Sequence, residues 1–140
     1  MSAKIFVDTN VLVYALDVDA GDKHEAAKST LSELWDQDSG AVSMQVLQEF
    51  YSTVTRKLAT PQSREKARLI VSQYALWCIA TTPKEIEHAF RIEDEARINF
   101  WDAMIVAAAA KAGATRILSE DLNPGQIIAG IVIENPFAVC

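Results

Sequence analysis

Four acidic residues lie in or close to apolar segments, where a charged side chain is unusual. They come from four separate parts of the chain and are Asp8, Glu49, Asp102 and Asp121. Carboxylates that gather in one place repel one another and take up protons unless a cation neutralises them. A hard divalent cation such as Mg²⁺ accepts oxygen ligands from carboxylates, water and phosphate groups. Such a site can activate water to hydrolyse a phosphate ester.

Two of these acids also have a simpler explanation as helix caps. Asp8 follows an apolar run over residues 5–7 and directly precedes Thr9, where a helix is expected to begin, so its side chain could cap that helix. Asp102 lies three residues after Asn99, at the spacing of a capping box, although Glu or Gln is more usual there. Its helix is apolar nearly all round, and an unpaired carboxylate on a buried helix is costly.

The other two acids have equally simple alternatives. Glu49 shares a helix face with Val46 and Phe50, so it is expected to point toward the body of the protein, although it could be a boundary residue of an amphipathic helix. Asp121 stands in Asp-Leu-Asn-Pro-Gly, which is ordinary turn chemistry. Glu120 is its neighbour and could replace it as the working acid.

The elements that must position these acids alternate along the chain. Short apolar runs, expected to be buried strands, occupy residues 5–7, 41–42, 77–79, 117–118 and 131–133. Segments with helical periodicity occupy residues 22–35, 45–58, 63–75, 83–94 and 100–112. This alternation predicts an α/β layer fold with a mainly parallel sheet. Because ligands bind beyond the carboxyl ends of such strands, the four acids are expected at one edge of the sheet.

Size and composition predict one domain over residues 1–140. Half of the 140 residues are hydrophobic, which is enough for a core. No segment has the apolar length of a membrane span, and the first residues do not resemble a signal peptide, so a cytoplasmic protein is expected. Cys78 and Cys140 are not expected to pair, and no Cys/His spacing indicates zinc. The three tryptophans are expected in the core.

The net charge of −6 argues against a broad electrostatic grip on nucleic acid. Five of the thirteen basic residues nevertheless fall within thirteen positions, and they are Arg56, Lys57, Arg64, Lys66 and Arg68. We call these five residues the basic strip. It is either a solvated helix face or a local surface for an anionic partner.

Four short motifs carry a family resemblance. FVDTN near the N-terminus, S-x-Q-V-L-Q-E-F, F-x-D-A-M-I-V-A-A-A and S-E-D-L-x-x-G occur in this order and resemble the four motifs of PIN domains. The closing ENPF, residues 134–137, also resembles the C-terminus of bacterial VapC-type toxins. The resemblance covers essentially the whole chain.

This resemblance implies an α/β/α sandwich around a small parallel sheet. It implies that Asp8, Glu49, Asp102 and Asp121 hold one or two Mg²⁺ or Mn²⁺ ions and cleave RNA. Ser119 matches a residue that often precedes the fourth acid, and a hydrogen bond from Asn10 to the first acid is expected. VapC-type toxins are cytoplasmic, commonly form homodimers and are silenced by a VapB-like antitoxin. The basic strip is then a candidate contact for RNA or for antitoxin.

Two other functions are compatible with parts of the sequence. A metal-dependent phosphatase with Asp8 as nucleophile would need a second Asp two residues later, where this chain has Asn10. A PIN-like module that only binds RNA or protein would fit the acidic net charge, although none of the four acids is missing.

Overall fold

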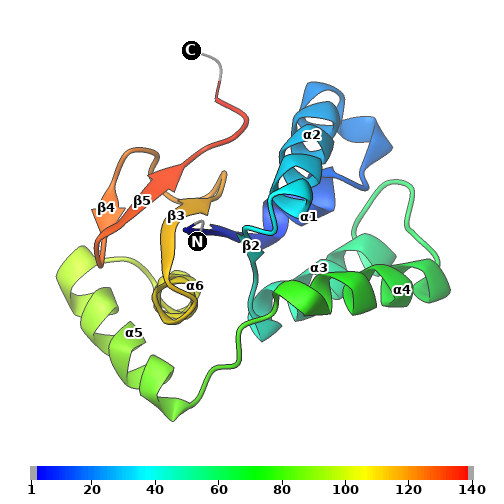
Figure 1. Ribbon diagram of the computed structural model, residues 1–140. Helices are drawn as coiled ribbons and strands as arrows, with labels where there is room; N and C mark the ends of the chain where they lie inside the picture. The colour runs from blue at the N-terminus through cyan, green and yellow to red at the C-terminus, as the bar shows by residue number, and fades with distance from the viewer. Residues whose placement is uncertain (1–2, 139–140) are drawn as a thin grey trace.

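The computed structural model describes residues 3–138, and its centre is a five-stranded sheet (Figure 1). The strand order is β2-β1-β3-β5-β4. All neighbours pair in parallel except β4 and β5, which are antiparallel. The strands are β1 Lys4–Val7, β2 Gly40–Ala41, β3 Ala114–Leu118, β4 Ile127–Ile128 and β5 Ile131–Glu134. The predicted α/β fold with a mainly parallel sheet is confirmed.

Helices flank the sheet in two packed groups (Figure 1). They are α1 Thr9–Tyr14, α2 Asp22–Asp36, α3 Met44–Arg56, α4 Arg64–Tyr74, α5 Pro83–Ala96 and α6 Phe100–Lys111, with the 3-10 turns η1 Val18–Ala20 and η2 Ala75–Trp77. In one group, α5 packs on α6 and α6 lies against β3. In the other, α1 contacts α2 and α3, and α3 contacts α4. All five predicted helices are present, with ends shifted by no more than two residues.

The strand predicted over residues 77–79 is wrong. The chain forms η2 there and makes only an isolated bridge between Val42 and Cys78. The Trp77 ring packs against β2 at Gly40, where an added Cβ would lie 2.7 Å from the ring. The apolar run therefore correctly predicted that Trp77 is buried, but it wrongly predicted a strand.

The short strand β4 was not predicted. It pairs with β5 across Ala129 and Gly130, whose φ angles are +51° and +79°. Two consecutive positive φ angles are the geometry of a type I′ hairpin turn. Ala is an unusual residue at such a position, so the sequence carries no strong turn signal there.

The buried apolar residues form one cluster around the sheet, and Phe6 and Val7 of β1 are fully buried within it. Trp77 belongs to this core, whereas the predictions for Trp35 and Trp101 are wrong, because 43% and 65% of these residues are exposed. Cys78 is a partly buried free thiol, and Cys140 lies outside the described residues. Within residues 3–138, no helix has the length and apolar character needed to cross a membrane.

Candidate active site

Asp8 lies where β1 ends and α1 begins, at the carboxyl edge of the parallel strands. Its backbone N–H donates to the Leu118 carbonyl of the neighbouring strand at 3.0 Å. Oδ1 accepts from the Thr9 backbone N–H at 2.8 Å, so Asp8 does cap α1. Oδ2 accepts from the Ser119 hydroxyl at 2.7 Å. The cap therefore uses only one oxygen of the carboxylate, and the other accepts from Ser119, the residue that directly follows β3.

Burial sets the electrostatic state of Asp8, of which 7% is exposed. Desolvation raises the pKa of its carboxyl to about 6, against the hydrogen bonds from Ser119 and Thr9, which lower it. The negative charges of Asp121 and Glu49 raise the pKa further. A carboxylate in this position is under pressure to take up a proton or a cation.

Ser119 and Asn10 join Asp8 to Asp121. The Ser119 hydroxyl, which donates to Asp8, also accepts from the backbone N–H of Asp121 at 3.1 Å. Asn10 Nδ2 donates to Asp121 Oδ2 at 3.2 Å, and Asn10 Oδ1 accepts from the Glu120 backbone N–H at 3.1 Å. The expected partner of Asn10 was Asp8, and this expectation is wrong. Asn10 holds the loop after β3 instead.

Glu49 reaches the same edge from α3, in the second turn after the N-cap Ser43. The residue is exposed, so the expectation that it points into the body of the protein is wrong. Its carboxylate accepts from the Thr9 hydroxyl at 3.0 Å and from Gln45 Nε2 at 3.3 Å. The same Gln45 amide donates to the Trp101 carbonyl at 3.3 Å, which links α3 to the start of α6.

Asp102 occupies the first turn of α6 and exchanges two hydrogen bonds with the N-cap Asn99. Asn99 Oδ1 accepts from the Asp102 backbone N–H at 2.9 Å, and Asn99 Nδ2 donates to Asp102 Oδ2 at 2.8 Å. Burial raises the pKa of the Asp102 carboxyl, the Asn99 bond lowers it, and the charges of Asp121 and Glu49 raise it. Asn99 is thus the expected N-cap, but Asp102 does not close a capping box, because its carboxylate accepts from the Asn99 side chain and not from the Asn99 backbone N–H. The carboxylate belongs to the group of interacting acids.

Glu120 points away from this group. Its carboxylate accepts from the Tyr14 hydroxyl at 2.7 Å and pairs with Lys23 Nζ at 2.6 Å. Burial raises the pKa of Glu120, but the bonds from Lys23 and Tyr14 together lower it below its usual value. Glu120 is therefore already neutralised, and Asp121 is the acid that the Asn10 amide connects to the cluster.

The four acids share one feature, which is that their bonded partners are neutral. The ion pairs found within residues 3–138 are Lys23–Glu120 and Arg116–Glu134, and neither involves the four acids. Their donors are instead Thr9, Asn10, Gln45, Asn99 and Ser119. Within residues 3–138, no three His, Cys, Asp or Glu side chains lie close enough together to hold a metal ion by themselves. The all-oxygen set nevertheless fits Mg²⁺ or Mn²⁺, since these ions use few carboxylates and keep several waters.

A cleft of about 580 Å³ opens beside the acids. Glu49 and Asp121 lie in its wall, and Lys57 is the only member of the basic strip that does. All five residues of the strip are exposed, but Arg68 lies on another face, where it donates to the Tyr51 hydroxyl at 3.1 Å. The strip is therefore not a single surface.

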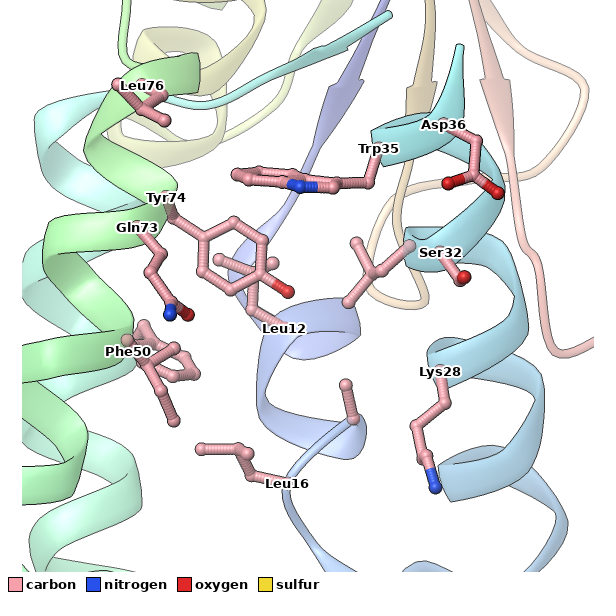
Figure 2. Close-up of a pocket in the computed structure, with 13 residues that line it drawn as sticks. Leu12, Leu16, Lys28, Ser32, Trp35, Asp36, Phe50, Gln73, Tyr74 and Leu76 are labelled. Atoms are coloured by element: carbon pink, nitrogen blue, oxygen red, sulfur yellow. The ribbon is translucent and has the colours of Figure 1, made fainter. Parts of the chain in front are cut away.

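A second groove, of about 510 Å³, lies between α2 and α4 over α1 (Figure 2). The Trp35, Tyr74 and Leu12 side chains point into it, and none of the four acids lines it. Trp35 is 43% exposed and Leu76, on its rim, is 81% exposed. This groove is an apolar surface that is separate from the acidic edge.

The part that several residues play in the site could not be predicted from the sequence. Thr9 stands next to Asp8, but only the fold brings its hydroxyl to Glu49, forty residues away in the sequence. Lys23 likewise reaches Glu120 only through the tertiary structure. Gln45 carries a usable signal, because a residue four positions before Glu49 lies on the same helix face.

The family model of the PIN domain matches residues 5–127. The chain belongs to the PIN domain family. None of the curated proteins searched matches this PIN domain. Among solved structures, a toxin–antitoxin complex from Klebsiella pneumoniae is similar at 19% identity and a TM-score of 0.69, covering 99% of this chain and 100% of that chain.

Two further structures show the same fold. VapC20 of Mycobacterium tuberculosis, described as a sarcin-ricin loop cleaving toxin, is 23% identical with a TM-score of 0.59, over 84% of this chain and 90% of that chain. DNA-bound VapBC from Salmonella typhimurium is 20% identical with a TM-score of 0.67, over 96% and 99%. At these identities the likeness establishes the PIN fold alone.

Proposed function

We propose that this PIN domain is a Mg²⁺- or Mn²⁺-dependent endoribonuclease and the toxin of a type II toxin–antitoxin pair. The observation that carries the proposal is the acidic edge, where carboxylates from four segments lie near enough to raise one another's pKa and are hydrogen-bonded by neutral partners only. Asp8, Asp102, Glu49 and Asp121 are the residues we assign to metal binding and catalysis, with Asn10 and Ser119 in support. The description of VapC20 as a sarcin-ricin loop cleaving toxin supports the proposal. The proposal includes a cytoplasmic location.

Asp8 and Asp102 are the acids that we assign to direct metal contact, because burial disfavours their charged forms most clearly. A bound Mg²⁺ or Mn²⁺ would lower the pKa of a water and stabilise charge on the phosphoryl oxygens. Ser119 and Asn99 hold the two carboxylates in fixed orientations. Glu49 and Asp121 complete the site, and one of them accepts the proton of the attacking water.

The test compares metal, substrate and carboxylate in one experiment. Purified protein is incubated with labelled structured RNA and with p-nitrophenyl phosphate, with Mg²⁺, with Mn²⁺ or with EDTA. We expect RNA cleavage only with metal, and a loss of at least a hundredfold in Asp8→Asn and Asp102→Asn. Release of nitrophenol with intact RNA would favour a phosphatase. RNA binding without cleavage, in protein free of any inhibitor, would favour a binding module.

The partner that we propose is a VapB-like antitoxin. Several structures with this fold are complexes of this kind, among them VapBC and FitAB assemblies. The apolar groove between α2 and α4 is the surface that we assign to an apolar segment of this partner, because its exposed rim leaves hydrophobic area in contact with water. The acids remain outside this groove, so inhibition would require a second segment or a change at the acidic edge.

A further inference from the structure

The cleft beside the acids follows one face of α3. Glu49, Thr53 and Lys57 succeed one another at intervals of four residues and all line the cleft. Residues four apart lie on the same side of a helix, and eight residues span about 12 Å. The backbone of Lys57 therefore lies two helical turns beyond Glu49, while its side chain lines the same cleft as the acids. This position suits Lys57 to contact a phosphate of the RNA other than the one that the acids would cut.

The lining of the cleft also contains apolar side chains. Val13 and Tyr14 of α1 contribute them together with Leu58, which directly follows Lys57. Asp17, the third acid of the lining besides Glu49 and Asp121, is engaged as the cap of η1 and accepts from the Asp19 backbone N–H at 3.1 Å. The cleft thus combines apolar side chains, hydroxyl groups at residues 52 and 53, three carboxylates and one ammonium group. Its volume of about 580 Å³ is in the range of sites that hold small ligands.

We propose that this cleft is a subsite for one unpaired nucleotide next to the scissile phosphate, with Lys57 binding its phosphate. The base packs against Val13, Tyr14 and Leu58, and the Ser52 and Thr53 hydroxyls face the sugar. This inference rests on the proposed ribonuclease function. It assigns the RNA contact to one residue of the basic strip and removes the other four from it.

Arg56 is a matched control residue for Lys57. Both residues lie at the end of α3, where any cation interacts favourably with the helix dipole. Both are exposed, but only Lys57 lines the cleft. A role in helix stability would be shared by the two residues, whereas a role in binding the nucleotide belongs to Lys57 alone.

The experiment measures RNA binding and RNA cleavage separately. Fluorescence anisotropy with a labelled single-stranded RNA gives the Kd in the Asp8→Asn background, where cleavage is not expected, over a series of salt concentrations. Steady-state cleavage gives KM and kcat in the otherwise unchanged protein. Each is measured for Lys57→Gln, Lys57→Arg and Arg56→Gln, with the melting temperature as a check of the fold.

For Lys57→Gln we expect Kd and KM to rise about tenfold, kcat to change little and the salt slope to fall by about 0.7. Lys57→Arg should restore most of the binding, and Arg56→Gln should change Kd less than twofold.

Equal effects of Lys57→Gln and Arg56→Gln would overturn the inference while leaving the nuclease in place. An unmodified protein that does not cut RNA, with Lys57-dependent binding intact, would refute the nuclease and keep the subsite. If Lys57→Gln weakened only inhibition by the antitoxin, the cleft would belong to that partner and the inference would be wrong.

Discussion

At the scale of single residues, the cost of burying Asp8 is the central feature of the site. The Ser119 and Thr9 donors offset only part of that cost, because the pKa of the carboxyl still rises to about 6 from 3.8. The native state therefore binds the Asp8 proton more tightly than the unfolded state does. Without a cation, the stability that this group contributes is fully present below about pH 3.8, is lost as the pH rises from 3.8 to about 6, and stays at the lower level above pH 6.

This difference predicts how Asp8→Asn changes stability. Asn keeps the shape but carries no charge, so in EDTA the variant should be more stable than the unmodified protein at pH 8, by up to about 3 kcal/mol. At pH 4 the gain should disappear, since Asp8 is then protonated in the native state. Urea denaturation at the two pH values measures this difference. A gain of the same size at both would contradict the role of charge.

Substitutions of the neighbouring residues Glu120 and Asp121 should differ in their effect on RNA cleavage. Asp121 is linked to Asp8 through Ser119, whose hydroxyl donates to Asp8 and accepts from the Asp121 backbone N–H, whereas Glu120 is paired with Lys23 and Tyr14. In RNA cleavage assays, Asp121→Asn should lose at least a hundredfold in kcat, and Glu120→Gln should lose less than tenfold. The reverse order would make Glu120 the working acid.

At the scale of elements, the sequence predicted the structure correctly where a sequence pattern is compatible with only one local structure. The apolar run before Asp8 forms the predicted buried strand, and because the carboxyl ends of parallel strands meet at one edge of a sheet, the position of Asp8 at that edge could be predicted. Residues 77–79 were not predictable in this way, because a short apolar run is compatible with any buried conformation. The hydrogen bonds of Asn10 and Thr9 depend on how the loop after β3 turns, which no local pattern specifies.

The contact of Gly40 with Trp77 gives a prediction for β2. A Cβ at residue 40 would lie 2.7 Å from three ring atoms, so Gly40→Ala must displace the ring or the strand. We expect a loss of about 1–3 kcal/mol in the free energy of unfolding, measured by urea denaturation. The double variant Gly40→Ala, Trp77→Leu should show a smaller loss than the sum of the single changes. Strict additivity would mean that the two residues do not interact.

At the scale of the whole molecule, an acidic protein with its acids gathered at one edge should be stabilised by the ion that it binds. Any ligand that binds the native state alone raises stability by mass action. Addition of Mn²⁺ or Mg²⁺ at millimolar concentration should therefore raise the melting temperature. The increase should be much smaller in Asp8→Asn and unchanged in Glu120→Gln. An equal increase in all three proteins would indicate nonspecific charge screening.

The separation of the acidic edge from the apolar groove implies that activity and inhibition can be changed independently. Leu76 is 81% exposed on the rim of the groove, so Leu76→Asp should leave the fold and RNA cleavage intact. A charge at this position should weaken binding of an apolar partner segment by at least tenfold, because the carboxylate would have to be desolvated. Co-expression with the product of a neighbouring short reading frame, followed by affinity measurement and cleavage assays, tests this. Leu69→Asp is the matched control for added negative charge, because Leu69 is 62% exposed on α4 but lies outside the groove. If Leu76→Asp and Leu69→Asp weakened the complex equally, long-range charge rather than the groove would govern association.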